Sequence, residues 1–452
     1  MIRGIGLRGA ISVNMITMIG IGPLITLPLV LSYLNGPLSL IGWIAGALVS
    51  MCDGLVWAEL SSRYPGSGGT YVYLREVFGA QGAGRLLAFL FNWQFIFWAT
   101  LIIASGYIGF ANYAAYLFPA LNTPWIAHTC AMAVGLLTIF LVYRKVTVVE
   151  RLSFVFFIAA TGTLLLIIAA GFTHPNFHQA FTLGSPMAFG IGFLAGLGQA
   201  LIITMYDYAG YSQSALMGDE VITPLRTIPR SIIISIILLA ALYIGLQLAV
   251  LAVVPWHTLV GKAPGDVPDG AQYVAATIVS TAWGPWQAKF ITFMILVTAF
   301  ASAYGSLVGF ARIPYAAAVG GEFLKPFAKL HPTGRFPYVS VLVIGLLTLP
   351  ASWLSLDAVI KFLTTGIVLI QGIAQVVALI VLRARGERPP FRMWLYPLPP
   401  IIALAGWIFV FANSGLLPIL FGLATLAAGA GVYLITARAQ RAWPFSPEPA
   451  PS

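Results

Sequence analysis

The sequence predicts an all-α polytopic membrane protein with about twelve transmembrane helices. Of its 452 residues, 60% are hydrophobic and only 8% are charged, and the mean hydropathy is +0.93. A soluble domain of this length needs far more polar surface. Apolar stretches near the roughly 20 residues that cross a bilayer recur along the whole chain. Short polar segments separate them, so little length remains for a soluble domain.

The third and eighth apolar stretches, at about 30 residues, exceed the bilayer thickness, and we expect them to be tilted or to extend beyond it. Because the number of spans is even, both termini are expected on the same side. The predicted spans cover residues 10–33, 38–60, 86–118, 125–143, 152–172, 187–217, 231–254, 286–317, 338–355, 361–383, 397–413 and 416–436.

The basic residues are distributed unevenly between the two sides of the predicted bundle. The formal net charge is +10, which alone would also suit a nucleic-acid-binding protein. With the N-terminus in the cytoplasm, all Lys and Arg residues except Lys262, Lys289 and Lys361 fall on the cytoplasmic side. This asymmetry follows the positive-inside rule. We therefore expect a multi-pass protein of the cell membrane with both termini cytoplasmic and no nucleic-acid partner.

Several kinds of site are absent from the sequence. Cys52 and Cys130 are the only cysteines, and neither lies in a metal-binding or disulfide pattern. The five histidines lack the spacing of metal ligands. We find no phosphate-binding Gly-rich loop and no nucleophile elbow. The sequence thus indicates no metal, no cofactor, no direct use of ATP and no enzyme.

Two spans carry helix breakers at their centres. In the first span Gly20, Ile21 and Gly22 precede a proline, which lacks a backbone donor. The sixth span contains the polar run 206–214, which includes Asp207. Irregular backbone at membrane depth survives only where it lines a cavity or is buried in protein. Either segment alone could be a packing notch or a kink, but the pair, five spans apart, favours a midplane binding site.

The loop after the second span is the most specific motif of the chain. Residues 58–79 read AELSSRYPGSGGTYVYLREVFG and resemble the corresponding loop of the amino acid–polyamine–organocation (APC) superfamily of transporters. The acidic pair at 219–220, followed by the basic, proline-containing segment 224–230, resembles a second pattern of that family. Arg312, with the proline and tyrosine that follow it, fits a weaker third pattern.

The resemblance implies the fold of LeuT-type transporters. Helices one to five and six to ten would form two inverted repeats, at residues 1–172 and 187–383. Two accessory helices would follow at 397–436. The proline-rich tail at 442–452 has no apolar periodicity, and we expect it to be disordered.

By similarity, amides around Ile21 and Gly22 would hold a substrate carboxylate, while carbonyls near residues 206–208 would receive its amine. The dipoles of the half-helices support both assignments. An aromatic residue in the third span could form a pocket wall or only pack, and a hydroxyl in the tenth could bind substrate or its own backbone. The predicted substrate-binding residues are Gly20, Ile21, Gly22, Trp98, Tyr206, Asp207, Tyr208, Gly210, Ser212 and Thr365.

Three acids are candidates for coupling or gating. Asp207 lies at mid-membrane, where an ionisable group indicates a substrate, ion or proton pathway, with a structural hydrogen bond as the alternative. Asp53 and Glu59 in the second span complete the set, and packing is an equal alternative for Asp53. Many relatives carry a lysine near Ala160 and an acid at the position of Ser212. Both are absent here, which leaves the coupling open, with H⁺ favoured over Na⁺.

The sequence thus predicts a secondary active transporter that works by alternating access, either proton-coupled or as an exchanger. An amino acid is the first expected substrate and a polyamine or another amine the second. A channel or a membrane-embedded enzyme is a weaker alternative, because a channel needs no paired breaks and an enzyme needs clustered acids and histidines near one membrane face.

Overall fold

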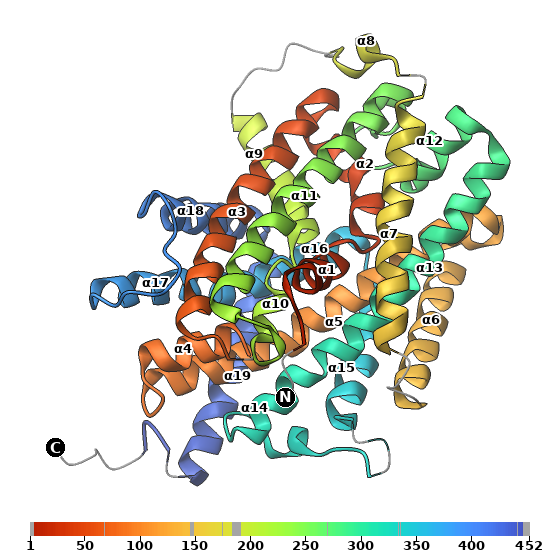
Figure 1. Cartoon of the computed structure of the whole chain (residues 1–452). Coiled ribbons are helices and arrows are strands. Elements are labelled where there is room, and N and C mark those ends of the chain that lie inside the picture. Colours follow the sequence, from red (N-terminus) through yellow and green to blue (C-terminus); the bar gives the residue numbers. More distant parts are fainter. Residues whose placement is uncertain are drawn as a thin grey trace.

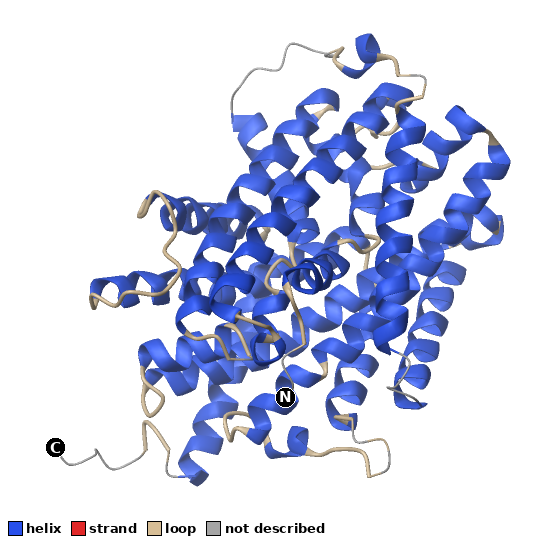
Figure 2. Cartoon of the chain, viewed as in Figure 1, coloured by secondary structure: helices blue, strands red, loops and turns tan. Residues whose placement is uncertain are grey.

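The computed structural model describes residues 4–66, 68–144, 149–173, 175–182, 191–268, 270–332, 334, 336–440 and 442–445. Within these ranges the regular structure is helical, and the single β pairing is an isolated bridge between Ile5 and Val221 (Figure 2). Helices satisfy their own backbone hydrogen bonds, as a chain in lipid requires. Among the sequence predictions, the arginines 3, 335 and 441, Lys145, the start of the sixth span at 187–190 and the tail at 446–452 lie outside the described residues.

Within the described residues, seven helical stretches are long and apolar enough to cross a membrane, and a bent pair forms an eighth candidate. In that pair α1 (Leu7–Met18) meets α2 (Gly22–Leu34) at an angle of 54°. The seven stretches contain α3 (Ser39–Arg63), α5 (Ala83–Leu117), α6 (Pro124–Arg144), α11 (Pro224–Val253), α13 (Pro285–Phe310) with α14 (Arg312–Val319), α16 (Leu356–Ile367) with α17 (Gln375–Ala384), and α19 (Leu416–Gln440).

The remaining predicted spans also contain helices. They are α7 (Val149–Gly171), α9 (Ile191–Tyr208), α15 (Tyr338–Ala351) and α18 (Leu398–Asn413). Of these, only α15 and α18 are shorter than 18 residues. The all-α polytopic class is therefore confirmed, whereas the count of twelve and the inverted repeats stay predictions.

Short helices between the spans were not predicted. An amphipathic helix, α4 (Thr70–Phe78), lies within the motif loop, and α12 (Val274–Trp283) follows a long connection. Neither reaches the roughly 20 residues of a spanning helix, so a search for apolar stretches of that length passes over them. The tenth span also contains a π-helical stretch at Val368–Ala374 between α16 and α17.

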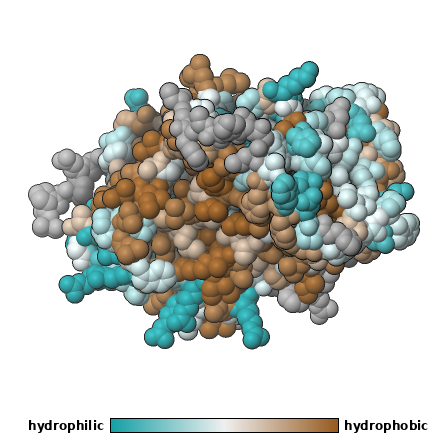
Figure 3. Space-filling model, turned by 90° about the horizontal axis from the view of Figure 1, so that it is seen from above, coloured by the Kyte–Doolittle hydropathy of each residue, from teal (hydrophilic) through white to brown (hydrophobic). Residues whose placement is uncertain are grey.

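Helix α5 is the most enclosed of the candidate spans and α19 is the least. In their apolar windows 72% of α5 is buried, against 17% of α19. In Figure 1 the bundle is viewed from the side, with α4 and α14 near the bottom and α8 (Phe177–Ala180) and α12 near the top. Figure 3 looks down on it from above and shows hydrophobic residues on the left and in the centre of that face, with more hydrophilic residues on the right and along the lower edge. Helix α19 exposes the large hydrophobic side chains Leu416, Leu417 and Leu420, which suit lipid as their solvent.

Both predicted helix breaks are present. The first separates α1 from α2 at residues 19–21, and the second separates α9 from α10 (Gln213–Leu216) at residues 209–212. The two breaks touch, because a Cβ atom at Gly210 would lie 3.1 Å from the backbone nitrogen of Met18. Gly210 also has φ +116°, a conformation that other residues rarely adopt. Glycine is thus required where the second break passes the first.

Candidate functional site

A cavity of about 90 Å³ lies against both breaks, and we call it the central cavity. Its walls come from the breaks, from α5 and α13, and from the π-helical stretch of the tenth span. Helix α5 contributes the aromatic side chains of Phe91, Phe95 and Trp98, and α13 and the π-helical stretch contribute hydroxyl and amide groups. The polar lining residues include Thr17, Ser105, Tyr206, Asp207, Ser212, Gln213, Ser302, Ser306 and Gln371.

Asp207 is the only carboxylate among the residues that line the central cavity. Its Oδ2 accepts a hydrogen bond of 2.6 Å from the hydroxyl of Thr26 on α2. Its Oδ1 is buried and has no hydrogen-bond partner within the described part of the chain. That oxygen lies beside the first break, 2.5 Å from where a Cβ atom on Gly22 would be. The cavity therefore offers one unsatisfied carboxylate oxygen, which is costly unless a ligand or a proton satisfies it.

The N-terminus of α2 offers the opposite polarity. The first amides of a helix have no partner within it and carry the positive end of the dipole. No side chain caps α2, which begins at Gly22 and has Pro23 in its first turn, where proline is favoured. An uncapped helix N-terminus suits an anion such as a carboxylate.

The N-terminus of α10 is occupied, in contrast to that of α2. The amide of Ser214 donates to Oδ1 of Asn14 on α1 at 2.7 Å, and the hydroxyls of Ser214 and Ser231 on α11 are 2.9 Å apart. Asn14 is fully buried. An amide in the first turn of α10 thus has a side-chain partner, whereas α2 begins without a side-chain cap.

A buried tyrosine of α11 links the two breaks. The hydroxyl of Tyr243 lies 2.9 Å from the carbonyl oxygen of Met18 and 3.2 Å from that of Asp207, and donates to these two acceptors. The carbonyl of Tyr206 accepts the amide of Ala209. The carbonyls of Tyr206 and Asp207 thus already have protein donors, whereas Oδ1 of Asp207 has none within the described residues. Tyr243 and Asn14 were not predicted, because each lies in an otherwise apolar span.

The central cavity extends toward one end of the bundle, where Arg63, Arg75 and Arg383 lie; we call it the arginine-rich end. On α5 the lining runs from Phe91, about two turns into the helix, to Gly106. On α13 it lies in the final turns, from Ser302 to Phe310. The lining thus begins near the arginine-rich end and, on α5, reaches past the middle of the helix.

Polar contacts join the helices at the opposite end. The hydroxyl of Tyr33 on α2 donates to Asp357 on α16 at 3.2 Å, and Lys361 pairs with Asp357 at 2.8 Å. The hydroxyl of Tyr113 on α5 donates to the carbonyl of Leu24 on α2 at 2.9 Å. These contacts hold α2, α5 and α16 together on the side away from the cavity.

Comparison with known proteins identifies the family of this chain. A profile described as amino acid permease matches residues 5–436. The chain belongs to the amino acid permease family. Its relatives are transporters, so the predicted transporter class is confirmed and the chain is a permease rather than an enzyme.

Three relatives show the range of this family. A serine/threonine exchanger of Bacillus subtilis is 27% identical over 94% of the permease and 95% of its own length. A branched-chain amino acid permease of the same bacterium is 24% identical over 89% and 86% of the two chains. Cationic amino acid transporter 4 of Mus musculus is 27% identical over 85% of the permease and 61% of the mouse protein.

Most of the predicted binding residues line the central cavity of the permease. The predicted residues that do so are Trp98 of the third span and, from the two breaks, Gly20, Ile21, Gly22, Tyr206, Asp207, Gly210 and Ser212. Two others lie elsewhere. Tyr208 is fully buried and donates to the carbonyl of Trp43 at 3.3 Å, and the hydroxyl of Thr365 donates to the carbonyl of Lys361 at 2.7 Å.

The two acids predicted in the second span also lie outside the central cavity. Asp53 accepts hydrogen bonds from Tyr211 and Trp407. Glu59 forms an ion pair with Arg383 and accepts the amide of Met393 at 2.9 Å. Neither side chain reaches a substrate in the cavity.

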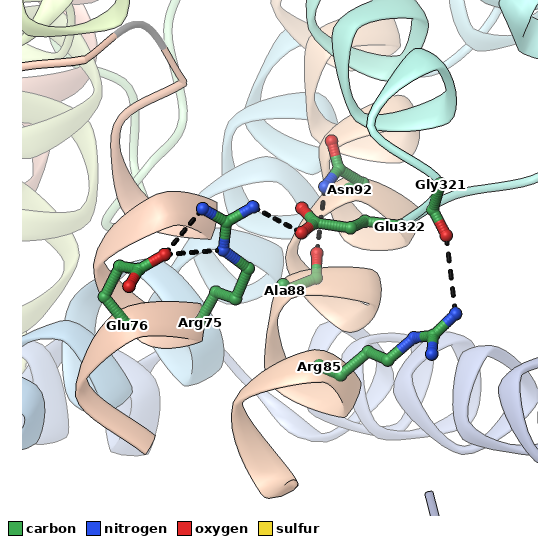
Figure 4. A network of polar contacts seen from close by, with 7 residues as sticks. All are labelled: Arg75, Glu76, Arg85, Ala88, Asn92, Gly321 and Glu322. Atoms are coloured by element: carbon green, nitrogen blue, oxygen red, sulfur yellow. Dashed lines mark hydrogen bonds and ion pairs between the residues drawn. The ribbon is translucent and has the colours of Figure 1, made fainter. Parts of the chain in front are cut away.

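Another group of charges at the arginine-rich end holds α4 (Figure 4). Arg75 on α4 binds Glu76 at 2.5 Å and Glu322, in the segment after α14, at 2.5 Å. Arg85, in the first turn of α5, reaches the carbonyl of Gly321 at 3.5 Å. The amphipathic helix is thus fixed to the end of the eighth predicted span. In the part of the chain that the structure describes, no group of acids, histidines or cysteines is arranged to hold a metal ion.

We expect Gly22→Ala to lower the transport rate by about tenfold, because its methyl group would overlap Oδ1 of Asp207 and approach the Tyr206 ring to 3.2 Å. Uptake by the reconstituted variant measures the effect. Gly366→Ala is the matched control, since a Cβ atom there meets no atom within 4 Å. Equal rates for both variants would contradict close packing between Gly22 and Asp207.

We expect Tyr243→Phe to slow transport by about tenfold, because it removes the donor shared by the two breaks at a cost of about 1–3 kcal/mol. Transport rate and thermal stability should be measured together. Tyr113→Phe removes an equally buried hydroxyl, which joins the first turn of α2 to α5 rather than one break to the other. If it slowed transport as much, the linking role of Tyr243 would be wrong.

Proposed function

We propose that this permease carries small neutral amino acids across the cell membrane by alternating access. The observation that carries the proposal is the unpaired Oδ1 of Asp207 beside the uncapped N-terminus of α2. An ammonium group suits the first and a carboxylate the second. The two groups of a zwitterion would thus meet complementary partners at adjacent breaks.

The charges of the central cavity favour a neutral amino acid over a polyamine. Asp207 is the one carboxylate in its lining, and no Lys or Arg side chain contributes to it. A polyamine has at least two ammonium groups and would leave one unpaired, which is costly away from water. The small volume, near 90 Å³, and the hydroxyls of Ser105, Ser302 and Ser306 favour a short side chain.

Exchange is the mode of transport that we favour, with proton coupling as the alternative and Na⁺ less favoured. The Bacillus subtilis relative that is similar over nearly its full length is a serine/threonine exchanger. With both termini in the cytoplasm, the arginine-rich end would face inward. The cavity would then extend toward the cytoplasm, while the contacts of Tyr33, Asp357 and Lys361 would close the outer side.

Proteoliposomes test the proposal. Vesicles loaded with unlabelled L-serine should accumulate labelled serine and threonine, and empty vesicles should accumulate far less. Imposed proton and sodium gradients on empty vesicles identify symport, and labelled leucine, arginine and putrescine define the range of substrates. Preference for putrescine would favour the polyamine alternative. Failure to accumulate any of these solutes would overturn the proposal.

A further inference from the structure

A second buried acid, Asp53 on α3, is joined to the sixth-span break without touching the central cavity. Its side chain is 1% exposed. The hydroxyl of Tyr211 donates to Oδ2 at 2.5 Å, and the indole nitrogen of Trp407 on α18 donates to Oδ1 at 2.9 Å. Tyr211 belongs to the four residues that link α9 to α10. Asp53 is therefore hydrogen-bonded directly to the connection between the two half-helices.

No positive charge compensates this carboxylate. Within the described residues, no Lys, Arg or His nitrogen lies in ion-pair distance of Asp53. A buried carboxylate that has neutral donors alone is expensive in its charged form. Its two hydrogen bonds offset part of that cost, and a proton would remove the charge.

The helices packed against α3 bring few titratable groups toward Asp53. Cys52 is its neighbour on α3. Helix α11 presents isoleucines to the adjacent Gly54. Helix α18 carries no acid or base, and the titratable side chain of α2, Tyr33, bonds Asp357. The other titratable groups on these helices have other partners or are exposed. Asp207 on α9 bonds Thr26, and Arg383 on α17 pairs with Glu59. Tyr208 and Tyr243 donate to backbone carbonyls, and Arg226 and Arg230 are exposed at the start of α11.

A smaller cavity lies on the far side of the sixth-span break, and we call it the side cavity. Its volume of about 30 Å³ is enough for about two water molecules. Tyr211 and Trp407 line it together with the polar groups of Ser50, Thr364 and Gln371. It shares wall residues with the central cavity, among them Tyr206, Gly210, Ser212 and Gln371. Hydrogen-bonding groups thus lie between the central cavity and Tyr211.

The chemistry of the two donors differs. A tyrosine hydroxyl both donates and accepts, whereas an indole N–H can only donate. A proton from water in the side cavity can bond to Oη of Tyr211 while the hydroxyl proton passes to Oδ2 of Asp53. The tyrosine stays neutral, the carboxylate becomes a carboxylic acid, and the new acid donates back to Tyr211. The solvent supplies the proton, and the polarity of the Asp53–Tyr211 hydrogen bond is reversed.

We propose that Asp53 is a proton-binding site of the transport cycle, reached from the cavities through Tyr211. Its protonation would set the conformation of residues 209–212, which we call the sixth-span link. Asp53 acts through Tyr211, so it is a positioning residue for the substrate site. The proposal requires a transport cycle but no particular substrate.

Hydrogen exchange of the permease in lipid nanodiscs between pH 5 and 8 tests the proposal without a substrate. Asp53→Asn is the main variant, because asparagine can accept from Trp407 and donate to Tyr211 as the neutral acid would. After correction for the intrinsic effect of pH, protection of residues 206–216 should change by about tenfold in the wild type and by less than about twofold in Asp53→Asn. Tyr211→Phe should also lose the response.

Two controls separate this site from the substrate site. Asp207→Asn should keep the pH response of the link, and Trp407→Phe should keep it with a shifted midpoint, because Tyr211 remains. Serine exchange by Asp53→Asn should show a flattened pH profile, which a purely structural role would not produce.

The proposal would be overturned if the protection of residues 206–216 in the wild type did not depend on pH. It would also be overturned if Asp53→Asn or Tyr211→Phe showed the same pH dependence as the wild type. If Asp53→Asn fails to fold, Tyr211→Phe decides, because it retains the carboxylate. If serine is not transported, the proposed function fails, while hydrogen exchange still tests Asp53.

Discussion

Asp207→Asn is expected to raise the KM for the transported amino acid by at least about 30-fold, because loss of one partner of a buried charge pair costs about 2–5 kcal/mol. The amide keeps an oxygen for the Thr26 hydroxyl, which is 2.6 Å from Oδ2. It removes the charge of the oxygen that has no protein partner. Initial rates of exchange over a range of serine concentrations give the KM of each variant.

Thr26→Val is the matched control for Asp207→Asn. It removes the hydrogen bond on the other oxygen and leaves the charge in place, so the expected loss is only about 1–3 kcal/mol. An Asp207→Asn variant with wild-type KM and wild-type exchange rate would remove Asp207 from the binding site.

The breaks could be predicted because their signal is local. Gly20 and Gly22 precede a proline in one span, and a polar run that contains Asp207 interrupts the other. Each feature disfavours a helix whatever surrounds it. The location of the central cavity followed from these breaks.

The connections that hold the breaks could not be predicted, because they join residues far apart in the sequence. Tyr243 bonds Met18, 225 residues away, and Asn14 bonds Ser214, 200 residues away. A lone tyrosine or asparagine in an apolar span is compatible with packing, an interface or a site. Only the arrangement of the helices distinguishes these roles.

The sequence also did not predict which side of a helix faces a cavity. Tyr206 lines the central cavity, whereas Tyr208, two residues later, packs on α3. Thr364 lines the side cavity, whereas Thr365 lines neither cavity, although both hydroxyls bond the preceding turn of their helix. Neighbouring helical positions point about 100° apart, and at a break the periodicity that would set the direction is lost.

Glu59→Gln is expected to destabilise the permease by about 3–5 kcal/mol, because it leaves the guanidinium of Arg383 buried without its charge partner. The Glu59 side chain is fully buried and that of Arg383 is 16% exposed. The carboxylate accepts the Arg383 nitrogens, one of them at 2.8 Å, and the amide of Met393. The ion pair therefore joins α3, α17 and the segment that leads to α18. Denaturant unfolding in one detergent, followed by tryptophan fluorescence, measures the loss.

The exposed pair at the same end of the bundle provides the contrast. Arg63 and Glu387 lie 2.7 Å apart with side chains 45% and 29% exposed, so Glu387→Gln should cost no more than about 1 kcal/mol. Replacing both buried partners, as in Glu59→Leu with Arg383→Met, should recover much of the loss, since no uncompensated charge remains. Equal costs for Glu59→Gln and Glu387→Gln would show that burial does not govern these two pairs.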